Sequence, residues 1–416
     1  MQGIIGILRT AILLLVSLAW CSVLVAAAGG VDGVLNVQDY GALGDGTTDD
    51  TKAFVDAWAA ACGATGSSAT LHVPAAKSFL VGLTRFSGPC ASTRITVLGT
   101  ITAPPASAWS EKKNYWLMFY QVDGLTVTGN STGLLDGSGK TWWSDKCKHG
   151  DDALLVMNCT DVELSQFSSK DSPQMHIGLS MSGKVNVTQL TITAPEDSPN
   201  TDGVHVDRSE DVHITGSTIG TGDDCISIGP GSRFVTVDRI VCGPGHGVSV
   251  GSLGRDGANE SVEYIDVRNV QFINTTNGAR IKTWKGGKGY AKSISFTNIN
   301  FTNVDHPVII NQFYEDRQDV SNTGAVALSN ITYTNLNGTS TGKTAVDFDC
   351  SKNGSCMDIH VNTVAITAAD GGATVARCQN AEVDTSGFVY PKIPCVANAA
   401  SPSPANAPSP SPRLSS

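Results

Sequence analysis

Short runs of β-branched and other apolar residues recur along most of this chain, and glycine, asparagine, aspartate and serine separate them. Each run has the length of a strand, and the residues between runs favour tight turns. Only residues 51–61 space their apolar side chains as an amphipathic helix does. Examples of the strand-like runs are Ile95–Leu98, Leu125–Thr128, Val185–Thr188, Val212–Thr215 and Phe234–Val237.

The apolar runs also recur at regular intervals. The aligned centres are separated by 27, 22, 22, 33 and 28 residues, and they are Ile177, Val204, Ile226, Val248, Ile281 and Ile309. Periods of this size are typical of solenoids, whereas a propeller blade needs about 40–50 residues. A sandwich is the other alternative. Several short strands per repeat with no helix between them predict an all-β fold, a parallel β-helix.

Composition supports one large β body. A length of 416 residues would ordinarily suggest two or three domains, but a repeat of this kind predicts that most of the chain forms one long coil instead. The chain is 41% hydrophobic and only 16% charged, which is enough apolar material for a sizeable core and unlike a disordered chain. Its net charge is −10 and it has no basic block, which argues against a nucleic-acid partner.

The two ends of the chain differ from the body between them. Residues 1–28 resemble a secretory signal, with Arg9, an apolar run and three small residues at Ala26–Ala28. A membrane anchor is the alternative, since the 18 residues of Ala11–Ala28 nearly span a bilayer. We expect cleavage that leaves a secreted chain with a net charge of −11, made of a body at 29–397 and a disordered Pro/Ser-rich tail at 398–416. After cleavage we expect no membrane association.

The cysteines agree with secretion. Eleven are present, and ten remain once Cys21 leaves with the signal. Near neighbours predict five disulfides, and no zinc-like Cys/His spacing occurs. The expected pairs are Cys62–Cys90, Cys147–Cys159, Cys225–Cys242, Cys350–Cys356 and Cys378–Cys395. Nine Asn-x-Ser/Thr sequences are compatible with an extracellular glycoprotein, and they begin at Asn130, Asn158, Asn186, Asn259, Asn274, Asn300, Asn330, Asn337 and Asn353.

The two shortest repeats carry a dense set of ionisable residues. Asp202, Asp224 and His246 follow one another at intervals of 22 residues, so they should occupy one column of three successive coils, with Asp223 beside them. Carboxylates stacked this closely repel one another, which raises the pKa of one of them and leaves a proton donor beside a charged base. A proton donor beside a charged base is the arrangement that acid/base hydrolysis of an acetal needs. Loop-capping aspartates and a calcium site are the alternatives, and His246 argues against calcium.

Basic residues follow one coil later. Alternation places Arg280 and Lys282 on one side of a strand, where they can bind a carboxylate of the substrate or pair with the aspartates. Tyr314 could contact a sugar or serve only in packing. We interpret His176 and His205 as structural or rim residues.

These motifs together resemble a known family. Asn200-Thr-Asp-Gly203, Gly222-Asp-Asp-Cys225, Gly245-His-Gly247 and Arg280-Ile-Lys282 are similar to the four ordered motifs of polygalacturonases, above all the plant members. The resemblance covers roughly residues 35–395. It implies a right-handed, single-stranded parallel β-helix that hydrolyses the α-1,4-galacturonosyl linkages of pectin in the cell wall, as a monomer and without metal or other cofactor.

The resemblance also implies roles for single residues. Asp223 would be the general acid, Asp202 and Asp224 would activate water, and His246 would orient the acid. The implied substrate-binding residues are Arg280, Lys282, Tyr314 and Asn200. Inversion of the anomeric carbon by single displacement would be expected with carboxyl groups about 6.5–9.5 Å apart.

Other activities remain open from the sequence. A related β-helix hydrolase could act on rhamnogalacturonan or xylogalacturonan. A pectate lyase would share the fold but would need calcium and a basic residue for elimination. A non-catalytic pectin-binding wall protein would need no intact acid/base set, and this chain has one.

Overall fold

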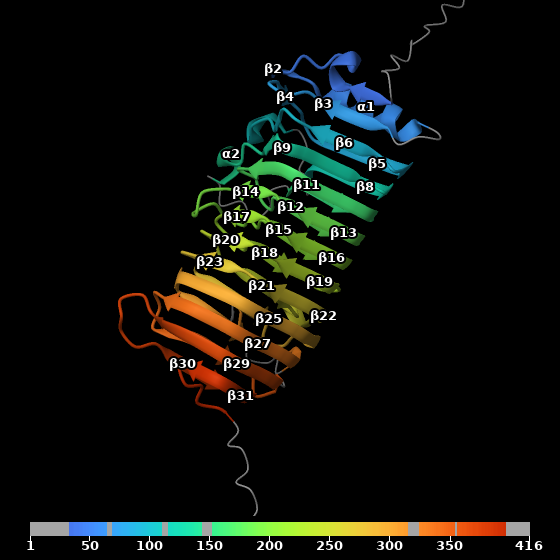
Figure 1. Cartoon of the computed structure of the whole chain (residues 1–416). Coiled ribbons are helices and arrows are strands. Elements are labelled where there is room, and N and C mark those ends of the chain that lie inside the picture. The colour runs from blue at the N-terminus through green and yellow to red at the C-terminus, as the bar shows by residue number, and fades with distance from the viewer. Residues whose placement is uncertain are drawn as a thin grey trace, which may run out of the picture.

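The computed structural model describes residues 33–64, 69–109, 115–143, 152–314, 324–353 and 356–396. These residues form one elongated stack of strands, which runs from the blue N-terminal end to the red C-terminal end (Figure 1). The expected signal at 1–28 and tail at 398–416 lie outside the described residues.

The strands fall into three sheets that run along the stack, and all the strand pairings among the described residues are parallel. Sheet 1 contains β5 (Thr84–Ala91), β8 (Tyr115–Asp123), β10 (Asp152–Met157), β12 (Ile177–Ser180), β15 (Val204–Asp207), β18 (Ile226–Ile228), β21 (Val248–Leu253), β24 (Asn277–Thr283), β26 (His306–Asn311), β28 (Thr344–Asp349) and β30 (Val375–Gln379).

Sheet 2 contains β1 (Val34–Asn36), β3 (Thr70–Val73), β6 (Arg94–Val97), β9 (Thr126–Asp136), β11 (Thr160–Lys170), β13 (Gly183–Thr188), β16 (Glu210–Thr215), β19 (Arg233–Asp238), β22 (Asn259–Arg268), β25 (Lys288–Val304), β27 (Ala327–Ser340), β29 (Cys356–Ala368) and β31 (Ala381–Tyr390). Sheet 3 contains β2 (Asp45–Asp49), β4 (Ser78–Leu80), β7 (Thr100–Thr102), β14 (Thr191–Thr193), β17 (Thr218–Gly220), β20 (Val241–Cys242), β23 (Gln271–Ile273) and the second halves of the long strands. The chain is therefore a parallel β-helix, as predicted.

Equivalent apolar residues of successive coils stack inside the helix. Ile177 pairs with Val204, Val204 with Ile226, and Ile226 with Val248, as the sequence alignment predicted. The two later positions were wrong: Ile281 pairs with Val250, and Ile309 pairs with Arg280 and faces outward. The loop after β21 contains a 3-10 turn, η3 (Arg255–Gly257), and such insertions change the repeat length.

The corner between sheets 2 and 3 is made by residues with left-handed backbone conformation. Asn269, Asn298 and Asn335 each have a φ of 56° and occupy this corner in three successive coils. Asparagine tolerates this conformation better than most residues. The side-chain amide of Asn298 donates to Asn269 at 3.2 Å, and that of Asn335 donates to Asn298 at 2.8 Å. The corner is thus stabilised by a ladder of amides.

Apart from η3, the helical segments among the described residues are short and lie before β10 in the chain. The predicted helix is α1 (Thr51–Gly63), which packs Phe54 and Trp58 onto the apolar interior. The others are α2 (Lys140–Trp143) and the 3-10 turns η1 (Val37–Tyr40) and η2 (Ala106–Ala108). The interior is one apolar cluster from Val37 to Ile393, so the described residues form a single body.

Four of the five expected disulfides are present, namely Cys62–Cys90, Cys225–Cys242, Cys350–Cys356 and Cys378–Cys395. The pairing of Cys147 with Cys159 was wrong. Cys159 carries a free thiol that is fully buried, and its Sγ accepts from the backbone N–H of Val122 at 3.4 Å. Its sulfur therefore points to the wall of the neighbouring coil. Cys147 lies outside the described residues.

Replacing one stacked aromatic residue tests how much the interior contributes. Phe301 is 1% exposed and its ring stacks on that of Phe272 with centroids 5.6 Å apart. We expect Phe301→Ala to lower the free energy of unfolding by about 3–5 kcal/mol, because it leaves a cavity between coils. The control is Phe388→Ala, which removes a side chain that is 66% exposed and should cost less than about 0.5 kcal/mol. Denaturant titration followed by circular dichroism measures both, and equal losses would contradict this view of the core.

Candidate active site

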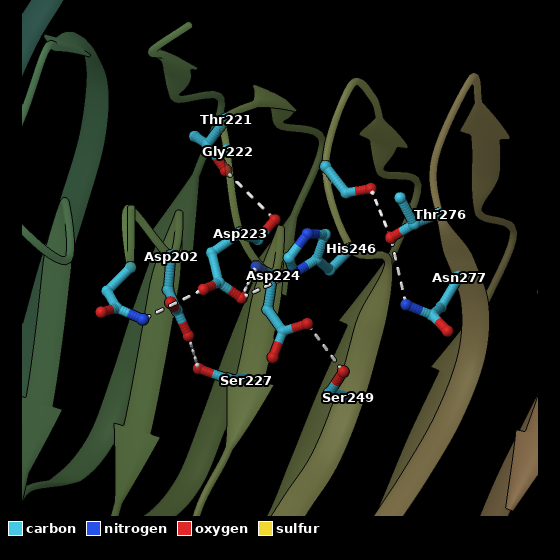
Figure 2. Close-up of polar contacts among 12 residues, drawn as sticks. Asp202, Thr221, Gly222, Asp223, Asp224, Ser227, His246, Ser249, Thr276 and Asn277 are labelled. Carbon is cyan, nitrogen blue, oxygen red and sulfur yellow. Dashed lines mark hydrogen bonds and ion pairs between the residues drawn. The ribbon is translucent and has the colours of Figure 1, made fainter. Parts of the chain in front are cut away.

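Three successive turns that enter sheet 1 bring the predicted ionisable residues together. The turns precede β15, β18 and β21, whose register offset is 22 residues in both steps, so Asp202, Asp224 and His246 do share a column. Backbone hydrogen bonds join the turns: the N–H of Gly203 donates to Asp224 O at 2.9 Å, and that of His246 donates to Asp223 O at 2.8 Å. The side chains meet at the edge of the sheet (Figure 2).

Gly247 shows why the last turn needs its glycines. Its φ is +84°, in the left-handed region, and a Cβ there would lie 2.3 Å from the carbonyl oxygen of Asn277. Only glycine fits between the two coils, and its position fixes the backbone that carries His246.

Asp224 is the most firmly held of the three carboxylates. Its side chain is fully buried, Lys282 Nζ donates to Oδ2 at 2.8 Å, and Ser249 Oγ donates to Oδ1 at 2.8 Å. The guanidinium of Arg280 also donates to Oδ1. Burial alone would raise the pKa of Asp224, but the charges of Arg280 and Lys282 outweigh it and lower that pKa to about 2. Asp224 is therefore a fixed negative charge.

Asp202 lies in the opposite electrostatic environment. It is buried, and Ser227 Oγ donates to its Oδ2 at 2.6 Å. Burial raises the pKa of Asp202 well above its usual value, and the negative charges of Asp223 and Asp224 raise it further. The repulsion predicted from the sequence thus acts mainly on this carboxyl group.

Asp223 is the carboxylate that reaches solvent. Its side chain is 19% exposed, against 0% for Asp224. The ring of His246 places Nδ1 3.0 Å from Oδ1, and the amide of Asn200 donates to Oδ2 at 3.3 Å. The side chain of His246 is itself 37% exposed. Asp223 and His246 therefore form the accessible side of the cluster.

Arg280, Lys282 and Tyr314 complete the cluster on the C-terminal side. Both cations are buried and bind Asp224, so the internal ion pair considered from the sequence is formed. Burial would lower the pKa of Lys282, but Asp224 raises it and keeps the ammonium charged. Lys282 Nζ lies 5.1 Å from the centroid of the Tyr314 ring, which also meets Trp284 edge-on at 5.7 Å. All eight predicted site residues thus lie together or directly beside the cluster.

A metal ion is the other group that this cluster could hold. Asp223, Asp224 and His246 each offer a ligand atom, and these three atoms lie within 4.8 Å of one another. Two cations already occupy the oxygens of Asp224, and their charge opposes a divalent ion at the same place. The donor set therefore fits a metal poorly.

The spacing of the carboxyl groups bears on the expected inversion. One oxygen of Asp223 and one oxygen of Asp224 lie within 4.8 Å of each other, because the two residues are adjacent in one tight turn. This is the nearest approach of two atoms, whereas the expected spacing of about 6.5–9.5 Å refers to the separation of the acid and the base as whole groups, so inversion stays a prediction.

The sequence interpretation missed two serines under the aspartates. Ser227 and Ser249 occupy one outward column of sheet 1 with His205 and Arg280. The signal available was the pattern of apolar, polar, apolar residues in β15, β18 and β21 at the same 22-residue offset. The structure places His205 next to this cluster, although it was interpreted as a structural or rim residue.

Within the part of the chain that the structure describes, none of the helices has the length and apolar character needed to cross a bilayer.

Comparison with known proteins agrees with the fold. Residues 62–387 match the model of glycosyl hydrolases family 28. A probable polygalacturonase of Arabidopsis thaliana is 41% identical over 370 residues, which are 87% of this chain and 80% of the relative. A polygalacturonase of Persea americana is 42% identical over 359 residues, which are 83% and 76% of the two chains.

Solved structures share the architecture. The endo-xylogalacturonan hydrolase of Aspergillus tubingensis superposes with a TM-score of 0.75 at 25% identity, covering 85% of this chain and 99% of that one. The polygalacturonase of Erwinia carotovora superposes with a TM-score of 0.67 at 22% identity, covering 81% and 94%. Together with the match to the family model over most of its length, these similarities show that this chain belongs to glycosyl hydrolases family 28.

Proposed function

We propose that this protein is a polygalacturonase, a hydrolase of the α-1,4-galacturonosyl linkages of pectin. The observation that carries the proposal is the cluster of three carboxyl groups in unlike environments, with two cations beside them. The named plant relatives at about 40% identity support the same substrate.

Asp223 is the proposed general acid. It is the carboxyl group that extends to solvent, where a glycosidic oxygen can reach it, and His246 and Asn200 hold it in place. Charge repulsion within the cluster keeps a proton among the carboxyl groups. In the reaction, Asp223 gives this proton to the glycosidic oxygen as the bond from that oxygen to C1 breaks.

Water is the proposed nucleophile. Asp202 and Asp224, which lie deeper than Asp223, hold the water and remove its proton as its oxygen bonds to C1. One water is consumed, and each cleavage yields a new reducing end and a new non-reducing end. The oxygens of Asp224 already accept hydrogen bonds from Arg280, Ser249 and Lys282, which disfavours attack of this carboxylate on carbon. A single displacement with inversion follows.

Arg280 and Lys282 are the proposed partners of the galacturonate carboxylate. They carry two positive charges beside three carboxyl groups, and a proton kept among those groups leaves two negative charges for the cations to balance, so an anionic sugar meets no net negative charge there. The ring of Tyr314 lies next to Lys282 and offers a face or a hydroxyl to the same sugar.

The surroundings of the enzyme form part of the proposal. Four disulfides are compatible with an oxidising compartment. In this proposal the protein is a monomeric glycoprotein of the plant cell wall. It consists of a cleaved signal at 1–28, the catalytic body at 29–397 and a tail at 398–416.

A xylogalacturonan hydrolase is the second candidate, because one such enzyme shares the fold at 25% identity. The test is hydrolysis of de-esterified polygalacturonate, xylogalacturonan and rhamnogalacturonan, with the new anomer followed by proton NMR. We expect cleavage of polygalacturonate with β-anomeric product first, since single displacement inverts the α linkage. Activity confined to either substituted polymer would overturn the substrate, and first-formed α product would overturn the displacement.

The acid assignment is tested by Asp223→Asn. Asparagine keeps the shape of the side chain but cannot donate the carboxyl proton, so we expect kcat on polygalacturonate to fall by about 10²–10⁴-fold with KM nearly unchanged. Asp384→Asn is the control, because that carboxylate is 64% exposed on β31 at the C-terminal end of the stack. More than about a tenth of the wild-type activity in Asp223→Asn would show that the acid lies elsewhere.

Lys282→Ala tests the proposed contact with the substrate carboxylate. We expect a higher KM for polygalacturonate and also a lower kcat, because the same ammonium holds Oδ2 of Asp224. Added salt should weaken binding by the wild type more than by the variant. Lys292→Ala is a matched control, since Lys292 also pairs with a carboxylate but is 40% exposed on β25. An unchanged KM in Lys282→Ala would remove this residue from the substrate site.

A further inference from the structure

A buried chain of hydrogen bonds leads from Asp202 into sheet 1. Ser227 Oγ lies 2.6 Å from Asp202 Oδ2 and 2.7 Å from His205 Nδ1. Ser227 is 3% exposed, and it pairs in register with His205 across β15 and β18. The ring of His205 lies against Gly229, where an added Cβ would be 3.4 Å from the ring. The chain is therefore held in place on both sides.

This chain can reverse its direction. Burial lowers the pKa of His205, which favours the neutral ring with one donor and one acceptor nitrogen. When Asp202 is ionised, His205 donates to Ser227, and Ser227 donates to the carboxylate. When Asp202 is protonated, its hydroxyl donates to Ser227, and Ser227 donates to His205. Each atom of the chain has a partner in both states.

Asp224 has no such freedom. Ser249 is the counterpart of Ser227 one coil later, but Arg280 Nε donates to Ser249 Oγ at 2.7 Å. The hydrogen of Ser249 must therefore point to Asp224. Asp224 accepts from Ser249, Arg280 and Lys282, so three of its lone-pair sites already face donor hydrogens, which favours the ionised carboxylate.

The charges around Asp202 agree with this difference. Asp223 and Asp224 face it from the turn before β18, and Lys282 faces it from β24. The backbone N–H of His176, in the coil before, donates to the carbonyl oxygen of Asp202 at 2.8 Å, and burial lowers the pKa of the His176 ring to about 3. Lys282 is the cation among these groups, and it is bonded to Asp224. Repulsion thus favours a proton on Asp202.

We propose that Asp202 alone accepts the proton of the attacking water, in the state in which Asp202 is ionised and Asp223 carries the proton of the cluster, and that Ser227 and His205 are positioning residues that let Asp202 change its protonation state. Asp224 stays ionised throughout and orients the water without taking its proton. The inference rests on the proposed hydrolysis and divides between two carboxylates a task that the family resemblance assigns to both.

Ser227→Ala tests the chain at its centre. The hydroxyl stabilises ionised Asp202, so we expect its loss to move the acidic limb of the kcat/KM–pH profile on polygalacturonate upward by about one to two pH units. Ser227→Thr retains a hydroxyl and should keep the wild-type limb. Ser249→Ala is the matched control: it removes the serine beside Asp224 and should lower activity without moving the limb, since Arg280 and Lys282 still hold that carboxylate ionised.

A second pair of variants tests the far end of the chain. His205→Leu leaves Ser227 without a partner in one protonation state, so we expect kcat to fall at least about tenfold with KM unchanged. His205→Gln can both donate and accept and should restore most of the loss. Wild-type kcat in His205→Leu would overturn the part assigned to His205.

Infrared titration of the free protein separates this inference from the proposed function. The protonated-carboxyl band that Asp202→Asn removes should titrate at higher pH in Ser227→Ala than in the wild type, with no substrate present. The inference would be overturned if Ser227→Ala moved neither the titration of the infrared band nor the acidic limb of the kcat/KM–pH profile. It would also be overturned if Ser249→Ala moved them as far as Ser227→Ala does. A wild type that leaves every galacturonan intact would instead refute the proposed function, and the infrared titration would still decide how Asp202 is held.

Discussion

In-register stacking of parallel strands is the constraint on which this protein depends. Coils that repeat at the strand spacing of about 4.7–4.9 Å must place equivalent side chains directly above one another. Inside the coil this aligns apolar residues such as Ile226 and Val248. These side chains carry no charge, so stacking them causes no repulsion and buries a continuous core. At the edge of sheet 1 the same rule aligns Asp202 with Asp224 and forces their charges together. The charges of Arg280 and Lys282 offset that repulsion. Asp202 reduces it further, because its carboxyl group favours the neutral form.

This local balance explains how an acidic protein can bind an acidic polymer. The chain carries a net charge of −10, which would repel a polyanion at long range. At the site, however, the two cations lie beside the carboxyl groups, and the neutral form that Asp202 favours removes one negative charge from the cluster. Net charge therefore excludes nucleic acid more convincingly than it excludes an anionic sugar, since the sugar meets the charges of the site and salt screens the rest.

The sequence predicted this fold and most of the site because the coils around the site have no insertions. Two identical 22-residue steps were enough to align Asp202, Asp224 and His246. The same reasoning failed at Ile281, where the loop with η3 changes the length of the coil by an amount that the apolar pattern does not reveal, and at Ile309, which is displaced from the correct position by one residue. It also missed Ser227 and did not connect His205 with the site, because a polar residue between two apolar ones resembles any outward strand position. Their importance depends on hydrogen bonds that only side-chain geometry shows. The predicted disulfide of Cys159 was wrong for a related reason, since nearness in sequence does not determine the direction in which a side chain points.

The central claim is that neighbouring side chains give the carboxyl groups of Asp202, Asp223 and Asp224 different protonation states and therefore different roles. A neutron crystal structure of the free protein, prepared in heavy water, measures this most directly, because it locates the deuterium on each carboxyl group. The account predicts an Asp224 without deuterium on either oxygen, and one deuterium held by Asp202 or shared between Asp202 and Asp223. Deuterium on Asp224, with Asp202 and Asp223 both bare, would contradict it.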